Sequence, residues 1–177
     1  VRLSVADALP DGPFDAAVLC VKTYALSAAL TEIAPHAAQI GQLVTFQNGV
    51  GAEDEAARHF GAARVTAASL TSPVSLSAPG VIALDRLGGG VGVADVAADT
   101  GFARRLKLAA QTELMPVTVF DDYRAMKWSK MLLNIVGNAS SAIYNLDVAQ
   151  IYADPKLFDQ EMRMARECLD VMRALKI

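Results

Sequence analysis

The sequence predicts an α/β protein in which a mainly parallel sheet is followed by a helical segment. Short apolar runs alternate with longer helical patterns through the first two thirds of the chain, the order that β-α-β units produce. No strand candidate follows Asp121, and long helical patterns fill the remainder. The 177 residues, 53% of them hydrophobic, can bury a sizeable core. We therefore expect a sheet domain in residues 1–120 and the start of a helical domain in residues 121–177.

The first half of the chain predicts three strands and two helices. The first strand is the apolar run 16–21, and an Ala- and Leu-rich helix follows over about residues 24–40. A second apolar run, 42–46, ends in the turn Gln-Asn-Gly-Val-Gly at residues 47–51. Residues 53–60 then predict a short helix with a polar face, and 64–70 a third strand.

The next elements complete the sheet and begin the helical segment. We expect a hairpin of residues 81–84 with 90–93 across a glycine-rich turn, a helix at 100–113 and a closing strand at 117–120. A long helix is expected over Tyr123–Tyr144. The last helix opens with Asp154 as N-cap and Pro155 at its first position, and its apolar stripe of 3.6-residue period indicates a packed face.

Composition excludes several classes of protein. Sixteen Lys and Arg against 19 Asp and Glu give a net charge of -3, so no basic field exists to hold a nucleic acid. No apolar run is long enough to span a membrane, and the first ten residues lack the order of a secretion signal. Two distant cysteines and two histidines without ligand spacing predict no metal site and fit a reducing cytoplasm. The valine at position 1 and the missing stop signal at Ile177 indicate a fragment.

The long helix 123–144 holds four polar residues on an otherwise apolar stretch, namely Lys130, Asn134, Asn138 and Ser141. At about 100° per residue their spacing of four, four and three puts them within roughly 80° of one another. Gly137 lies in the same sector, where a missing side chain leaves room for a ligand. We interpret this line as a binding surface, and the alternative is a partly exposed helix face.

A second candidate site lies where two predicted strands end. Asn48 follows the second strand in a glycine-containing turn, and Lys22 follows the first. Open α/β sheets bind their ligands at the carboxyl ends of parallel strands. The alternatives are an ordinary turn and a surface lysine. The run Gly-Gly-Gly-Val-Gly at 88–92 has neither the spacing of a dinucleotide loop nor a Lys-Ser/Thr pair, so we interpret it as a turn.

Four motifs, taken in order, resemble the ketopantoate reductase (2-dehydropantoate 2-reductase) family. They are Val-Lys-Thr-Tyr at 21–24, Gln-Asn-Gly-Val-Gly at 47–51, Ala-Pro-Gly-Val at 78–81 and Arg-Ala-Met-Lys-Trp-Ser-Lys at 124–130, with Asn134 and Asn138 after them. The resemblance implies a partial Rossmann domain in residues 1–120 that binds NADPH. It also implies the start of a helical substrate and dimerisation domain in residues 121–177, which allows a homodimer.

The resemblance also implies roles for individual residues. Lys130 is the expected catalytic lysine, Asn134 and Asn138 are expected substrate contacts, Asn48 is a contact shared by cofactor and substrate, and Lys22 is a cofactor contact. The implied reaction is the NADPH-dependent reduction of 2-dehydropantoate or a related 2-oxo acid, a cytoplasmic step of pantothenate biosynthesis.

Three departures from the family pattern stand out. The chain lacks the amino-terminal glycine-rich fingerprint and most of the carboxyl-terminal domain, with its substrate-binding serine and glutamate. The family's frequent Asn-Pro-Leu-Thr-Ala becomes Asn-Ala-Ser-Ser-Ala at 138–142, which affects the expected substrate. The alternatives are a β-hydroxy acid or sugar-phosphate dehydrogenase of similar plan, and a catalytically silent NADP-binding module or inactive fragment.

Overall fold

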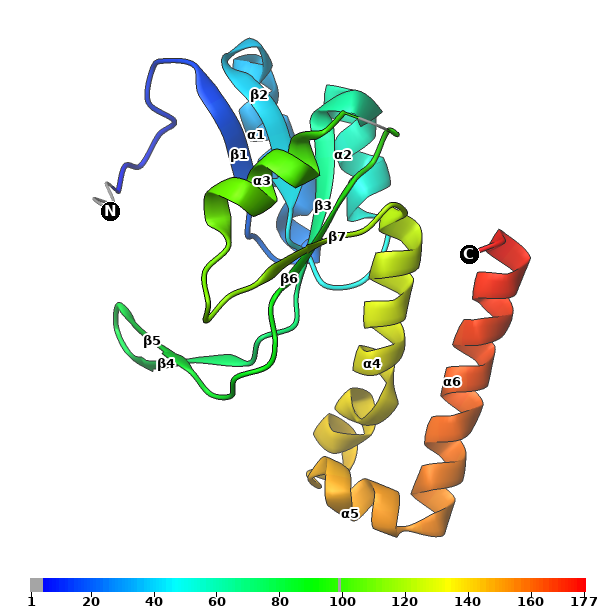
Figure 1. Ribbon diagram of the computed structural model, residues 1–177. Coiled ribbons are helices and arrows are strands. Elements are labelled where there is room, and N and C mark those ends of the chain that lie inside the picture. Colours follow the sequence, from blue (N-terminus) through cyan, green and yellow to red (C-terminus); the bar gives the residue numbers. More distant parts are fainter. Residues whose placement is uncertain (1–4, 99) are drawn as a thin grey trace.

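The computed structural model describes residues 5–98 and 100–177 (Figure 1). Its main sheet has five strands in the order β1-β2-β3-β6-β7. These strands are β1 Phe14–Leu19, β2 Ile40–Thr45, β3 Val65–Leu70, β6 Val91–Asp95 and β7 Val117–Val119. A separate two-stranded hairpin consists of β4 Val74–Ala78 and β5 Val81–Leu84.

The five-stranded sheet is mainly parallel, as the sequence predicts. β1 pairs in parallel with β2, β2 with β3, and β6 with β7, whereas β3 and β6 are antiparallel. The parallel pairs bring the carboxyl ends of β1, β2 and β3 to the same edge of the sheet. A ligand site at that edge therefore draws on all three strand ends.

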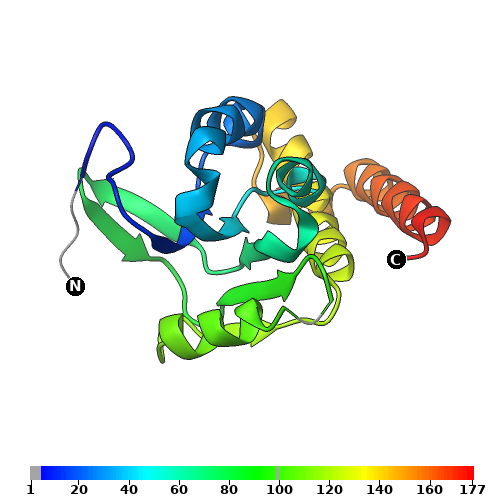
Figure 2. The same ribbon diagram turned by 90° about the horizontal axis from the view of Figure 1, so that it is seen from above.

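Helices cover both faces of the sheet (Figure 2). Helices α1 (Leu26–Ile33) and α2 (Ala52–Phe60) form one apolar cluster with Leu43 of β2. Helix α3 (Phe102–Ala110) forms another with Val44, the next residue of the same strand. Successive strand residues point to opposite faces, so the two clusters lie on opposite sides.

The carboxyl-terminal segment is a helical hairpin beside the sheet. Helix α4 (Tyr123–Tyr144) begins directly after β7, and its Asp122 N-cap accepts hydrogen bonds from the backbone N–H groups of Arg124 and Ala125 at 2.8 and 3.1 Å. A short helix, α5 (Val148–Ala153), leads into α6 (Pro155–Leu175), which runs back alongside α4 (Figure 1). Asp154 and Pro155 open α6 as predicted. None of the described helices has both the length and the apolar character to cross a bilayer.

Three sequence expectations are wrong in detail. The helix expected over 24–40 is α1 flanked by 3-10 turns at Thr23–Ala25 and Ala34–Gln39, because Pro35 lacks an N–H and disrupts a continuing α-helix. The hairpin partner of β5 is β4 rather than residues 90–93, of which 91–93 belong to β6 in the main sheet. Helix α5, which opens with a capping box of Asp147 and Gln150, was not expected.

Candidate active site

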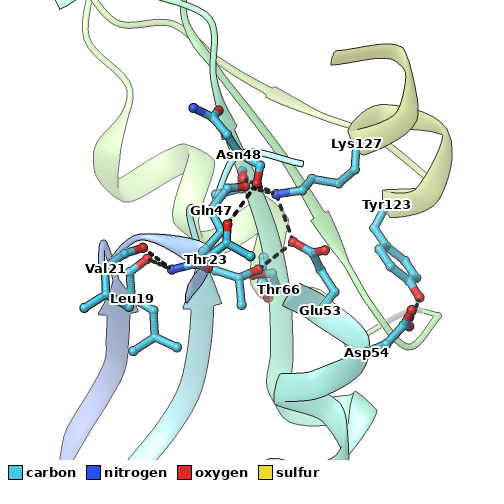
Figure 3. A network of polar contacts seen from close by, with 12 residues as sticks. Leu19, Val21, Thr23, Gln47, Asn48, Glu53, Asp54, Thr66, Tyr123 and Lys127 are labelled. Carbon is cyan, nitrogen blue, oxygen red and sulfur yellow. Dashed lines mark hydrogen bonds and ion pairs between the residues drawn. The ribbon is translucent and has the colours of Figure 1, made fainter. Parts of the chain in front are cut away.

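The turn after β2 lies beside the end of β1, as predicted. Lys22 and Asn48 each follow the end of a strand by three residues, and these strands are parallel neighbours. The hydroxyl of Thr23 donates to the backbone carbonyl of Asn48 at 3.2 Å, which joins the two segments (Figure 3). Both Lys22 and Asn48 have exposed side chains. The structure therefore places them at one edge of the sheet, where a ligand can reach them.

The buried side chain of Gln47 connects this turn to the end of β1. Its Nε2 donates to the carbonyls of Leu19 and Val21 at 2.9 and 3.1 Å. Because these carbonyls belong to the end of β1, the amide ties the β2 turn to the neighbouring strand. Gln47 belongs to the motif 47–51, but its role could not be predicted from the sequence because its partners lie 26 and 28 residues away.

Lys127 of α4 reaches the same turn from the other side (Figure 3). Its side chain is only 3% exposed, and its Nζ donates to the carbonyls of Gln47 at 2.6 Å and Ala68 at 3.3 Å. It also forms an ion pair with Oε1 of Glu53 at 3.0 Å. The Glu53 side chain is 1% exposed, and the same oxygen accepts from the Thr45 hydroxyl at 2.9 Å.

Sequence reasoning missed this buried ion pair. One signal was present: Glu53 shares the buried face of α2 with Ala56 and Phe60, at positions i, i+3 and i+7. A carboxylate on a buried helix face needs a partner, because an unpaired buried charge is strongly unfavourable. The identity of that partner depends on the tertiary fold, since 74 positions separate residues 53 and 127.

Tyr123 makes a second contact between α4 and α2. Its hydroxyl donates to Oδ1 of Asp54 at 2.8 Å and accepts from Nε of Arg124 at 3.2 Å. Partial burial is the main cause that raises the pKa of the Tyr123 hydroxyl, and the Arg124 hydrogen bond opposes it. The hydroxyl is therefore neutral near pH 7 and acts as a donor.

Lys130 lies one helical turn further along α4 and is half-buried. It lines a pocket of about 350 Å³ between α4, the sheet and the glycine-rich run 88–92. The pocket combines polar groups with an apolar wall; its side-chain lining includes Lys130, Ser69, Thr71, Ser129, Val91, Phe120, Met126 and Leu133. An ammonium at the side of a mixed pocket suits a small polar substrate with an apolar part.

The glycine-rich run 88–92 forms one wall of this pocket. Gly88, Gly89 and Gly90 form a loop, whereas Val91 and Gly92, expected in the same turn, begin β6. A Cβ added at Gly89 would lie 2.5 Å from Cα of Ser72, and one added at Gly90 would lie 2.5 Å from the Pro116 carbonyl oxygen. The glycines are therefore required because neighbouring backbone approaches closely.

Asn48, Asn134 and Asn138 do not line this pocket. Asn134 is half-buried on α4 and Asn138 is exposed. The expected single polar line from Lys130 to Ser141 is wrong beyond Asn134, because Val136 (φ -81°, ψ 116°) and Gly137 (φ 89°, ψ -37°) interrupt the helix. Whether the asparagines and Lys130 act on one ligand stays a prediction.

The break in α4 is held by Glu161 of α6, which is fully buried. Its Oε2 accepts from the Gly137 backbone N–H at 2.6 Å, and its Oε1 accepts from the Ser140 hydroxyl. The room for a ligand expected at Gly137 is absent, because Val148 fills it: a Cβ at Gly137 would lie 3.2 Å from Cγ2 of Val148. Glycine occupies position 137 because the break requires a positive φ there.

Comparison with known families matches both parts of the chain. Residues 1–96 match the family Ketopantoate reductase PanE/ApbA, and residues 122–177 match Ketopantoate reductase PanE/ApbA C terminal. A search of curated proteins found no match.

Several solved structures share the fold. The 2-dehydropantoate 2-reductase from Geobacter metallireducens GS-15 is 25% identical with a TM-score of 0.77, and the match covers 90% of this chain and 53% of that one. D-mandelate dehydrogenase with NADH is 18% identical with a TM-score of 0.80, covering 92% and 54%. The PanE/ApbA family ketopantoate reductase from Ralstonia eutropha JMP134 is 22% identical with a TM-score of 0.76, covering 94% and 54%. The chain thus spans about half the length of these proteins.

Proposed function

The chain belongs to the ketopantoate reductase PanE/ApbA family, and on that premise we propose that it carries the catalytic lysine of a nicotinamide-dependent 2-oxo acid reductase. The proposed reaction is the reduction of 2-dehydropantoate or a related 2-oxo acid, with NADPH as the proposed cofactor. The observation that carries the proposal is the half-buried Lys130 on a mixed pocket at the junction of sheet and helical segment.

The residues present fit part of a dinucleotide site. Lys22 offers a cation and Asn48 an amide, both exposed at the carboxyl edge of parallel strands where such ligands bind. These two residues would hold the cofactor, and Asn48 would also contact the substrate. The bound nicotinamide would supply the hydride.

Lys130 supplies the electrostatic part of the reaction. Reduction of a ketone forms a C–H bond at the carbonyl carbon and moves the C=O π electrons onto oxygen. The Lys130 ammonium stabilises the growing negative charge and then gives its proton to that oxygen, which yields the hydroxy acid. Asn134 and Asn138 are proposed to orient the substrate, with Asn138 placed by the helical segment after the break.

The proposed organisation assigns residues 1–120 to cofactor binding and 121–177 to the start of a substrate and dimerisation domain. D-mandelate dehydrogenase, a structural neighbour, was solved with NADH, so the cofactor preference requires a direct comparison. A catalytically silent NADP-binding module is the second candidate, because Asn134 and Asn138 do not line the pocket that Lys130 lines.

The test uses the protein encoded by the complete reading frame that includes this chain. Oxidation of NADPH and of NADH is followed with 2-dehydropantoate and with a panel of aliphatic and aromatic 2-oxo acids. Turnover of at least one 2-oxo acid supports the reductase. Cofactor binding without turnover of any member of the panel favours the silent module. The upstream reading frame shows independently whether a glycine-rich fingerprint precedes residue 1.

A further inference from the structure

Lys127 has surroundings that packing alone does not require. It is a lysine at 3% exposure whose ammonium contacts three separate elements: the carbonyl of Gln47 after β2, the carbonyl of Ala68 in β3, and Glu53 in α2 (Figure 3). An apolar side chain fills such a space at lower desolvation cost, but it cannot bond two carbonyls and a carboxylate at once. The ammonium therefore contributes geometry rather than simple burial.

We propose that Lys127 is a positioning residue of the reaction site. Its side chain holds the turn that carries Asn48 and the part of α4 that carries Lys130 in one fixed arrangement. This inference rests on the function proposed above for Asn48 and Lys130. Lys127 acts through these two residues, since its own ammonium is bound to protein groups and shielded from solvent.

The contact to the turn acts directly on the backbone of Asn48. The carbonyl of Gln47 and the N–H of Asn48 belong to one planar peptide unit, so fixing the carbonyl fixes the plane. Lys127 holds this carbonyl at 2.6 Å, and Thr23 holds the carbonyl of Asn48 at 3.2 Å. The backbone of Asn48 is thus fastened on both sides, from α4 and from the end of β1.

The contact to α4 acts on Lys130 through the helix. Lys127 and Lys130 stand at i and i+3 on the regular part of α4, before the break at Val136, and such positions are neighbours on one face. A helix turns by about 100° per residue, so fastening Lys127 limits rotation of this face about the helix axis. Met126, Ser129 and Lys130 line the same pocket, and its shape depends on that rotation.

The carboxylate of Glu53 balances the buried charge of the Lys127 ammonium. An ammonium buried without a counter-charge is strongly unfavourable, and the carboxylate at 3.0 Å balances it. Glu53 is itself held by Thr45, the last residue of β2. Removing only one member of the ion pair leaves the other charged and buried, whereas removing both charges avoids that penalty.

The experiment compares three variants of the protein encoded by the complete reading frame. They are Lys127→Met, the double variant Lys127→Met with Glu53→Gln, and Lys156→Met as the control at an exposed position of α6. Each is measured for Tm and for kcat and KM with the 2-oxo acid that the wild type reduces. Each is also measured for hydrogen exchange at Phe46 and Glu55, whose N–H groups flank the turn and donate to the carbonyls of Leu19 at 3.1 Å and Gly51 at 3.2 Å.

We expect Lys127→Met to lower Tm, to speed exchange at Phe46 and Glu55 at least tenfold and to lower kcat/KM at least tenfold. The double variant should regain most of the Tm loss, because no charge remains unpaired, while exchange and kcat/KM stay impaired. Lys156→Met should match the wild type. Recovery of kcat/KM and exchange together with Tm in the double variant would show that Lys127 acts only through stability.

Hydrogen exchange separates this inference from the proposed function. If the wild type reduces no 2-oxo acid, the proposed function fails, and positioning of the turn is still decided by exchange at Phe46 and Glu55. Wild-type exchange rates in Lys127→Met overturn the positioning role whatever the activity. Faster exchange with unchanged kcat/KM overturns its connection to the reaction.

Discussion

The break in α4 determines whether Gly137→Ala raises or lowers the free energy of unfolding. In a regular helix this substitution stabilises by about 0.8 to 1.0 kcal/mol, because glycine is the poorer helix former. At the observed φ of 89° and ψ of -37°, a sparsely populated region for side-chain-bearing residues, an alanine instead costs about 1 to 3 kcal/mol of steric strain. Its Cβ would also lie 3.2 Å from Cγ2 of Val148, which must yield by a few tenths of an ångström. We therefore expect a net loss of about 1 to 2 kcal/mol.

Chemical or thermal unfolding measures this change. For a chain of this size a loss of 1 kcal/mol lowers Tm by about 2 to 4 °C, so the expected fall is about 2 to 8 °C. Gly80→Ala is the control for strain alone, because Gly80 also has a positive φ, of 75°, with nothing within 4 Å of an added Cβ. Gly137→Ala should cost more than this control, and adding Val148→Ala should relieve the crowding. A Gly137→Ala protein more stable than the wild type refutes the break.

Three further predictions concern chemistry, pH and the helix after the break. Lys130→Ala should lower kcat for 2-oxo acid reduction by ~10² or more with little change in cofactor affinity. The control Lys156→Ala, at an exposed position, should leave kcat unchanged. Loss of cofactor affinity at wild-type kcat in Lys130→Ala would reassign Lys130 to cofactor binding. The Tyr123 hydroxyl has a pKa above its ordinary 10.0, so its stabilisation is complete below about pH 10 and falls as pH rises through the raised pKa; Tyr123→Phe should remove this alkaline loss in unfolding measurements. Ala139→Pro, in the first turn after the break, should lower the free energy of unfolding less than Ala142→Pro does. Ala142 lies inside the helix, where proline should lower the free energy of unfolding by about 3 kcal/mol. Equal free energies of unfolding for the two variants would contradict this prediction.

The sequence was sufficient to predict the fold class because each element carries its own signal. Alternating apolar runs and helical patterns predicted the strands of the main sheet and the three helices that cover it, and Asp154 with Pro155 predicted the start of α6. The position of Lys22 and Asn48 at one sheet edge followed from the rule that parallel strands end together. These inferences depend on neighbours in sequence or on the handedness and direction of β-α-β units.

Features that depend on tertiary contacts could not be predicted in this way. Strand β4 was overlooked because its Val-Ser-Leu-Ser-Ala pattern is short and exposed; within the described residues it pairs with β5. The helical-wheel argument from Lys130 to Ser141 assumed one regular helix, and the buried carboxylate that holds the break comes from α6. The partners of Lys127 likewise come from three elements far from it in sequence.

The break also gives a physical reading of the segment 138–142, where Asn-Ala-Ser-Ser-Ala stands in place of the family's frequent Asn-Pro-Leu-Thr-Ala. A proline is tolerated in the first turn of a helix, where backbone N–H groups have no partner within the helix, and Ala139 occupies such a place after Gly137. In this chain the positive φ of Gly137 and the hydrogen bonds of Glu161 hold the break without proline. The change at the residue after Asn138 therefore does not by itself remove the break. Under the proposed function we expect substrate preference to depend on residues that line the pocket, such as Met126 and Leu133.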